Sequence, residues 1–295
     1  MPNAMGPLRQ RQASVIQIGM YAANQPLHRF REHGYAVVRT VLLFLFTLGS
    51  APFTADGGTQ FRVATYNASL AQTTQGRLAA LLNNQNYTNA RRVAEVLQII
   101  RPDVVLINEF DYDAARLSLN RFHDNFLNVS QNGRDPLSYA FRYTAPSNTG
   151  VHSEFDLDNN EVIDDSPGDR NYGGDAFGFG EFEGKYAMAV YSRFPIRFAD
   201  VRTFRTFLWQ DMPGALLPED PADTDRDGDR DNFYNKAERD VFRLSSKSHW
   251  DIPIEVDGQI FHFLACHPTP PVFDGEEDRN GRRNHRSEER RVGKD

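Results

Sequence analysis

Apolar residues recur with different periods along the chain, and each period predicts a different element. Residues 61–67 are rich in β-branched and aromatic side chains, which favours a strand that ends at Asn67. The apolar residues of the stretch 89–100 recur at the spacing of one helix face. They are Val93, Val96, Leu97 and Ile100. A helix is therefore expected here, and Pro102 ends it because proline cannot continue the helical hydrogen bonding.

Further strands are predicted on both sides of the middle of the chain. Residues 104–107 form a continuous apolar run with many β-branched side chains, which is typical of a strand covered on both faces. Residues 185–191 favour another strand. Apolar and polar residues alternate over 252–256, the pattern resumes over 260–265, and Asp-Gly lies between them, which predicts a β-hairpin. This order of elements indicates an α/β protein whose sheets are covered by helices.

Two acidic segments between these elements are expected to form loops. Residues 223–228 carry Asp at every second position before a glycine, as in the first half of a calcium-binding loop. Tyr234, however, stands where that loop needs a bidentate glutamate. Residues 156–160 match less well, because Glu161 stands where the glycine is wanted. Each segment is interpreted either as a solvated acidic loop or as a structural Ca²⁺ site.

The first 55 residues have the pattern of an N-terminal extension with a secretory signal peptide. Basic residues between positions 28 and 39 precede a short apolar core at 41–48, and small residues follow at 49–51 and at 55. The core is too short to span a bilayer, which takes about 20 residues, so no stable membrane span is expected. We therefore expect a secreted or periplasmic protein. The alternative is that the apolar core is a first strand or helix of the domain.

Composition narrows the class of protein. The chain has 295 residues, 40% of them hydrophobic, so it can bury the core of one domain with inserts. Its net charge of −7 excludes a broad basic surface for nucleic acid. The single cysteine, Cys266, excludes an intrachain disulfide and a cysteine-rich zinc site. Neighbouring residues of a strand point to opposite faces, so Cys266 and His267 are not a nucleophile and its base. No feature indicates a protein partner.

Five motifs in a fixed order carry the chemistry. Thr-Tyr-Asn ends the first strand, Arg-Pro-Asp closes the helix, and Asn-Glu-Phe, centred on Glu109, ends the second strand. Tyr-Ser-Arg-Phe-Pro-Ile follows at 191–196, and the hairpin ends in Ala-Cys-His-Pro at 265–268. Over residues 60–285 this order resembles the endonuclease/exonuclease/phosphatase superfamily. That family includes pancreatic-type deoxyribonucleases, abasic-site endonucleases, neutral sphingomyelinases and inositol-polyphosphate phosphatases.

The resemblance implies a fold and a class of reaction. The fold is a four-layered α/β sandwich, with two mixed sheets face to face and helices outside, formed by residues 59–285. The reaction is divalent-metal-dependent hydrolysis of a phosphoester outside the cytoplasm, by a phosphodiesterase or nuclease or by a phosphatase. The substrate would be nucleic acid, phospholipid or a small phosphate ester, and the acidic charge slightly favours the latter two over duplex DNA.

Three residues are the candidates for this reaction. The Glu109 carboxylate is a hard oxygen ligand suited to Mg²⁺ or Mn²⁺. Asn67 would ligate the metal through its side-chain carbonyl or orient the attacking water. His267 would donate a hydrogen bond to the scissile phosphate, or polarise it if protonated. Each also has an ordinary interpretation: a turn-forming asparagine, a solvated strand end, and a histidine that caps a strand.

Two departures from the family pattern limit this prediction. A Gly-Asp-x-Asn strand and a Ser-Asp-His strand are expected after His267, and neither occurs there. Gly-Asp-Arg-Asn at 168–171 matches the first pattern but precedes the 191–196 motif, so we expect it on an exposed loop away from the active site. Residues 286–295 are a charge run, interpreted as an artefactual tail or as a genuine charged helix or tail. The fold is therefore expected to be incomplete at the C-terminus and this chain to be an inactive fragment. The alternative is a non-catalytic extracellular binding protein with calcium-stabilised acidic loops on the same fold.

Overall fold

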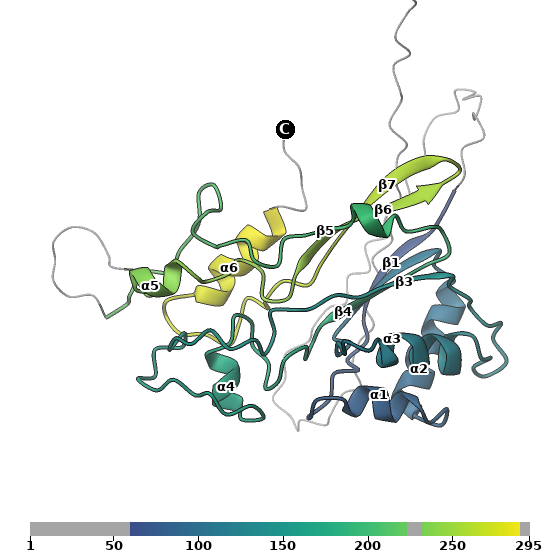
Figure 1. Ribbon diagram of the computed structural model, residues 1–295, viewed down its shortest axis with the longest axis horizontal. Helices are drawn as coiled ribbons and strands as arrows, with labels where there is room; N and C mark the ends of the chain where they lie inside the picture. Colours follow the sequence, from purple (N-terminus) through teal and green to yellow (C-terminus); the bar gives the residue numbers. More distant parts are fainter. Residues whose placement is uncertain (1–59, 223–231, 290–295) are drawn as a thin grey trace, which may run out of the picture.

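The computed structural model describes residues 60–222 and 232–289, which form two β-sheets (Figure 1). The first sheet has the order β1-β2-β4-β3, and the second has the order β5-β6-β7. The strands of the first sheet are β1 (Val63–Asn67), β2 (Val104–Asn108), β3 (Phe141–Tyr143) and β4 (Met188–Ser192). Those of the second are β5 (Arg202–Thr203), β6 (His249–Val256) and β7 (Gln259–Cys266). The first sheet is mixed, because β1 and β2 are parallel and the other pairs are antiparallel.

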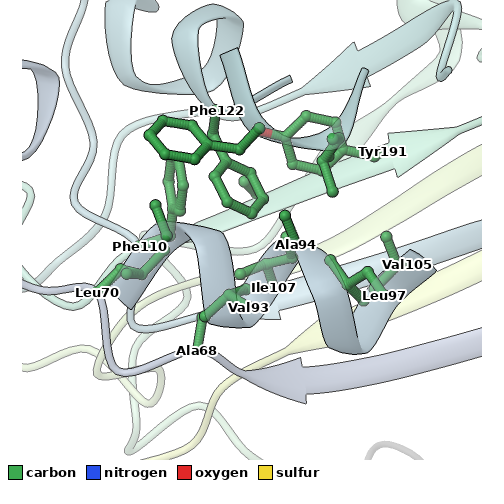
Figure 2. Packing of buried hydrophobic residues seen from close by; sticks show 14 of the residues in the cluster. Ala68, Leu70, Val93, Ala94, Leu97, Val105, Ile107, Phe110, Phe122 and Tyr191 are labelled. Carbon is green, nitrogen blue, oxygen red and sulfur yellow. The ribbon is translucent and has the colours of Figure 1, made fainter. Parts of the chain in front are cut away.

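Helices cover the outer face of the first sheet. They are α1 (Arg77–Leu82), α2 (Thr88–Ile100) and α3 (Leu117–Phe122), and a π-helical turn (His123–Leu127) follows α3. Figure 2 shows the α2 side chains Ala94 and Leu97 packed toward Val105 and Ile107 of β2. Burying one such leucine stabilises the fold by about 2 kcal/mol. The helix predicted over 89–100 is confirmed, and it ends where Arg101 adopts the left-handed conformation before Pro102.

A second hydrophobic core fills the space between the two sheets. Val104 and Leu106 of β2 point into it, together with Met188 and Val190 of β4. The opposing sheet contributes Trp250, Ile252, Ile254 and Val256. All residues of β2 and β4 are buried because each strand faces helices on one side and the second sheet on the other. The predicted α/β sandwich is therefore confirmed, as is the hairpin, formed by β6 and β7.

Long connections and short helices build the other end of the molecule, where α4, α5 and α6 gather (Figure 1). The elements here are α4 (Arg170–Gly174), α5 (Lys236–Arg239) and α6 (Arg279–Glu289). A 3-10 turn (Phe198–Asp200) lies elsewhere, against β6. A third core holds this region together around Trp209, with Phe177, Tyr234, Phe242 and Leu244 packed on it. Because these residues come from irregular segments, no apolar period in the sequence predicted this core.

Several predicted segments lie outside the described residues. They include the signal peptide in residues 1–55, the acidic loop at 223–228 and the last residues of the charged tail, 290–295. The beginning of that tail continues α6 as far as Glu289. Within the described ranges, none of the helices combines the length and hydrophobicity needed to cross a bilayer.

Candidate active site

The parallel pairing of β1 with β2 places Asn67 beside Glu109. Asn67 is the last residue of β1 and lies opposite Asn108, the last residue of β2, and Glu109 follows directly. Nδ2 of Asn67 donates a hydrogen bond of 2.7 Å to Oε1 of Glu109, while Oδ1 of Asn67 accepts one of 3.1 Å from the amide of Ser69. The two predicted metal-site residues are thus in direct contact.

Glu109 has an unusual backbone conformation, with φ of 57° in the left-handed region. Such a conformation is uncommon for a residue other than glycine and costs on the order of 1 kcal/mol. It is maintained by hydrogen bonds on both sides, from the amide of Leu70 to the Glu109 carbonyl and from the amide of Phe110 to the Ala187 carbonyl, at 3.0 and 3.1 Å. The turn directs the carboxylate off the strand end.

His267 reaches the same place from the second sheet. It follows Cys266, the last residue of β7, and lines a cavity of about 700 Å³ together with Asn67 and Glu109. All three candidate residues therefore line the same cavity. Burial, with Lys247 adding to it, lowers the pKa of His267 to about 3. The imidazole is therefore neutral near pH 7.

Lys247 lines this cavity as well, although no pattern in the sequence indicated it. Its side chain is buried, with 7% exposure, and its Nζ lies 3.5 Å from the carbonyl of Pro268. No ion pair joins it to a carboxylate in the part of the chain that the structure describes. Burial, with Arg283 adding to it and Glu109 opposing it, lowers the pKa of Lys247 to about 8. A buried ammonium group without a carboxylate partner is suited to an anionic ligand.

Arg283 of α6 supports the cavity wall with a second buried positive charge. Its Nε donates to the carbonyl of Leu244 at 2.9 Å, and its Nη2 donates to those of Phe177 and Arg243, both at 2.6 Å. Its guanidinium also lies 4.5 Å from the centroid of the Phe242 ring. Burial lowers its pKa to about 10, so it remains charged at neutral pH. The arginine thus joins three segments of the wall that are distant in sequence.

A comparison with protein families matches residues 64–285 to the Endonuclease/Exonuclease/phosphatase family. The chain belongs to this family. The match covers the elements that supply all three candidate residues. The comparison with curated proteins gives no match.

Three solved structures are similar to this family member at low identity. An endonuclease/exonuclease/phosphatase family protein from Leptotrichia buccalis C-1013-b is 14% identical, with 80% of this chain and 64% of that chain covered and a TM-score of 0.34. An endonuclease/exonuclease/phosphatase from Beutenbergia cavernae DSM 12333 is 17% identical, with 72% and 39% covered and a TM-score of 0.30. A β-hairpin deletion mutant of beta toxin from Staphylococcus aureus is 14% identical, with 81% and 64% covered and a TM-score of 0.34. The chain thus spans less than two thirds of the length of each.

The Gly-Asp-Arg-Asn segment at 168–171 has a different place from the one expected. It is exposed, as predicted, but Arg170 and Asn171 line the cavity, so the expectation that it lies away from the active site is wrong. Asp169 caps α4 by accepting a hydrogen bond of 2.9 Å from the amide of Asn171. Buried Tyr172 then fixes the helix, because its hydroxyl donates to the Gly150 carbonyl at 2.8 Å. These contacts between loops were not visible in the order of motifs.

Three aspartates form an acidic cluster beside α4. Carboxylate oxygens of Asp156, Asp158 and Asp175 lie within 4.8 Å of one another. Asp175 is fully buried and accepts hydrogen bonds from the amides of Leu157 and Asp164, at 3.0 and 2.8 Å. Oδ1 of Asp158 is buried without a hydrogen-bond partner among the described residues. Burial and the two neighbouring carboxylates raise the pKa of Asp158. The sequence indicated the first two residues, and Asp175 was missed because it follows much later in the chain.

Asp111 is a buried carboxylate hydrogen-bonded to Tyr186, which lines the cavity. It accepts hydrogen bonds from the amides of Gln72 and Tyr186, at 2.7 and 3.1 Å. Burial raises its pKa to about 7, and these two hydrogen bonds oppose that effect. Tyr186 lines the cavity in a left-handed conformation with φ of 53°. Asp111 thus links the turn after β2 to the segment before β4.

Proposed function

We propose that this protein is an exported, divalent-metal-dependent phosphoester hydrolase whose reaction takes place in the cavity at the ends of β1, β2 and β7. The observation that carries the proposal is the convergence of Asn67, Glu109, His267 and the buried Lys247 in one cavity. Two of these side chains are in direct hydrogen-bond contact. A carboxylate, a neutral imidazole and an ammonium group together match what a phosphoester needs: a metal ligand, a hydrogen-bonding group and a positive charge.

The donor atoms present suit Mg²⁺ or Mn²⁺. The Glu109 carboxylate lines the cavity, and the Asn67 amide beside it is another oxygen-bearing group, which is the ligand chemistry that hard divalent cations prefer. When bound there, such an ion would neutralise charge on the phosphate oxygens and lower the pKa of a coordinated water. The hydrogen bond from Asn67 fixes the orientation of Glu109 toward this role.

The other residues act on the phosphate itself. Lys247 attracts the anionic ester, and the charge of the ester in turn offsets the cost of burying the ammonium group. His267, with its pKa lowered to about 3 by burial, donates or accepts a hydrogen bond as a neutral imidazole. Because it carries no charge, its contribution is to orient the ester in the cavity. The acidic net charge of −7 favours a small or lipid ester over duplex DNA.

Because four polar side chains meet in one cavity, we propose activity for the 295-residue chain in place of the inactive fragment expected from the missing motifs. The test is metal-dependent hydrolysis of bis-p-nitrophenyl phosphate by this chain and its Glu109→Gln variant. The expected result is turnover that needs Mg²⁺ or Mn²⁺ and that falls by about 1,000-fold in the variant, with unchanged circular dichroism. Glu95→Gln is the control, because Glu95 is a half-buried carboxylate on α2 that does not line the cavity. Absence of metal-dependent turnover, or equal turnover by Glu109→Gln, contradicts the proposal and favours a non-catalytic binding protein.

A structural calcium ion at Asp156, Asp158 and Asp175 is a second proposal. The specific observation is the buried Oδ1 of Asp158, which has no hydrogen-bond partner among the described residues and faces two more carboxylates. Ca²⁺ takes several carboxylate oxygens, and an ion that binds only the folded state raises its stability. Millimolar Ca²⁺ should therefore raise the melting temperature, and Asp158→Asn should abolish the rise. The exposed Asp165→Asn is the control, and an undiminished rise in Asp158→Asn contradicts this site.

Export rests on the pattern of residues 1–55 alone. Expression of the whole chain in a bacterium should yield a processed protein outside the cytoplasm that begins between positions 50 and 60. N-terminal sequencing of the fractionated protein measures this, and an unprocessed cytoplasmic protein contradicts it.

A further inference from the structure

Large apolar side chains are exposed around the opening of the cavity. Phe273 is 81% exposed, Val272 is 48% exposed and Phe179 is 43% exposed, and all three line the cavity that holds Glu109. Phe273 has the largest exposed fraction among the exposed large hydrophobic side chains of the described residues. Single exposed apolar residues are ordinary on protein surfaces, but a group of them around a cavity marks a binding site.

The two segments that carry these side chains are held in place by hydrogen bonds and packing. The Phe179 ring packs on α4 so closely that a Cβ at Gly173 would lie 2.9 Å from its Cε2. In the other segment, the Asn280 side chain donates to the Val272 carbonyl at 3.0 Å, and the Asn280 amide donates to Oδ2 of Asp274 at 2.6 Å. The backbone is thus fixed by α6 while the apolar side chains stay exposed. Their exposure is a property of an ordered segment.

The interior of the same cavity has the opposite character. Lys247 and Arg283 are buried there, and His267 and Glu109 are polar. The volume of about 700 Å³ is within the range of pockets for drug-sized molecules, and a phosphate group alone would fill only part of it. A ligand with a charged end and an apolar end would therefore match both the interior and the opening.

We propose that Phe273, Val272 and Phe179 form a subsite for an apolar substituent of the phosphoester, of about the size of a phenyl ring. This proposal rests on the proposed function, because it places the phosphate near Lys247 and Glu109. The substituent then lies against the Phe273 side chain at the opening, and Phe273 is a specificity-determining residue. An aromatic base and a short acyl chain share this chemistry, so both belong to the class of substituent that the subsite accepts.

The experiment compares binding of phenylphosphonate and methylphosphonate to the whole chain in the presence of Mg²⁺, by isothermal titration calorimetry. Both ligands carry the same charged group and neither is hydrolysed at its C–P bond. Phenylphosphonate should bind about 10-fold more tightly, because the ring leaves water at the Phe273 subsite. Phe273→Ala should remove most of this preference and leave methylphosphonate binding unchanged. Phe179→Ala is a second variant with the same expected direction.

Phe198→Ala is the matched control, because Phe198 is 49% exposed in the 3-10 turn and does not line the cavity. Equal affinity of the wild type for the two ligands, or a preference that survives both Phe273→Ala and Phe179→Ala, overturns the subsite and leaves the proposed function standing. Failure of both ligands to bind contradicts the proposed phosphate site itself. Adenosine 5′-monophosphate and dihexanoylphosphatidate then identify the source: the ligand whose affinity falls in Phe273→Ala supplies the apolar group.

Discussion

The cavity has a floor made by strand ends and a wall made by loops and α6, and the two are built differently. On the floor, Asn67 and Glu109 are adjacent because β1 and β2 pair in register within a sheet that lies between two cores. In the wall, Lys247 and Arg283 are positioned by contacts between segments far apart in sequence. We therefore expect that changing a floor residue has little effect on folding, whereas changing a wall residue can affect folding and binding together.

The largest effect on stability is expected from Arg283→Met in the wall. This change removes a charged donor from the buried carbonyls of Phe177 and Leu244 and from the half-buried carbonyl of Arg243. We therefore expect a loss of about 3 to 5 kcal/mol in the free energy of unfolding. Urea denaturation followed by circular dichroism measures it. Arg282→Met is the control, since Arg282 donates to the Leu217 carbonyl at 3.0 Å from a less buried position, and it should cost less than about 1 kcal/mol.

Lys247→Met is expected to weaken ligand binding at the wall without weakening folding. Loss of the buried charge should weaken methylphosphonate binding about 10- to 100-fold, since the anion loses its charged partner. The free energy of unfolding should stay equal or rise, because a buried ammonium without a carboxylate partner is removed. The exposed Lys236→Met should change neither quantity. A marked loss of stability in Lys247→Met would mean that this lysine supports the wall as Arg283 does.

On the floor, Asn67→Ala should reduce metal-dependent turnover about 10-fold, less than Glu109→Gln. The variant loses the hydrogen bond of 2.7 Å to Glu109 but keeps the carboxylate itself. Its melting temperature should change by only a few degrees, because Asn67 is exposed at the end of β1. Turnover measured at saturating Mg²⁺ distinguishes orientation of Glu109 from metal affinity. A melting temperature lowered as far as that of Arg283→Met would remove the distinction between floor and wall.

The smallest effect concerns the pH dependence of stability through His267. The folded pKa of about 3 lies below the unfolded value of about 6.5, so the unfolded state binds a proton first as the pH falls. The stability contributed by the neutral histidine is therefore complete above about pH 6.5 and declines below it, by about 1 kcal/mol between pH 7 and pH 5.5. His267→Gln should show a correspondingly flatter profile in urea denaturation over this range. Identical profiles for the two proteins would contradict the burial of this imidazole.

The sequence predicted the position of a residue where that position depends on the apolar period of a helix or strand and on the order of the strands. The buried strand at 104–107 and the helix at 89–100 were predicted because packing on two faces or one face leaves a periodic pattern. Asn67 and Glu109 could then be placed at one sheet edge, because parallel neighbouring strands end on the same side. His267 was found as the end of the predicted hairpin.

The wall could not be predicted in this way, because its residues lie on segments without a period. Lys247 stands among serines before β6, and nothing in that run indicates a buried charge facing a cavity. Asn171 was assigned to a distant loop because motif order gives no information on how loops fold back. Asp175 joins Asp156 and Asp158 only through the path of the chain around α4. In each case the position depends on contacts between residues far apart in sequence.

The hydrogen bonds of Arg283 also set an order of assembly during synthesis. The first sheet and its helices are complete once residue 192 has been made, so they can fold on the emerging chain. The carbonyls of Phe177 and Arg243, by contrast, acquire their common donor only when residue 283 leaves the ribosome. Until then Asn67 and Glu109 are exposed at the end of the first sheet, and α6, which joins the segments of the opposite wall of the cavity, is absent. The cavity is therefore a late product of translation, and a ribosome stalled before this point would present a folded sheet without the complete cavity.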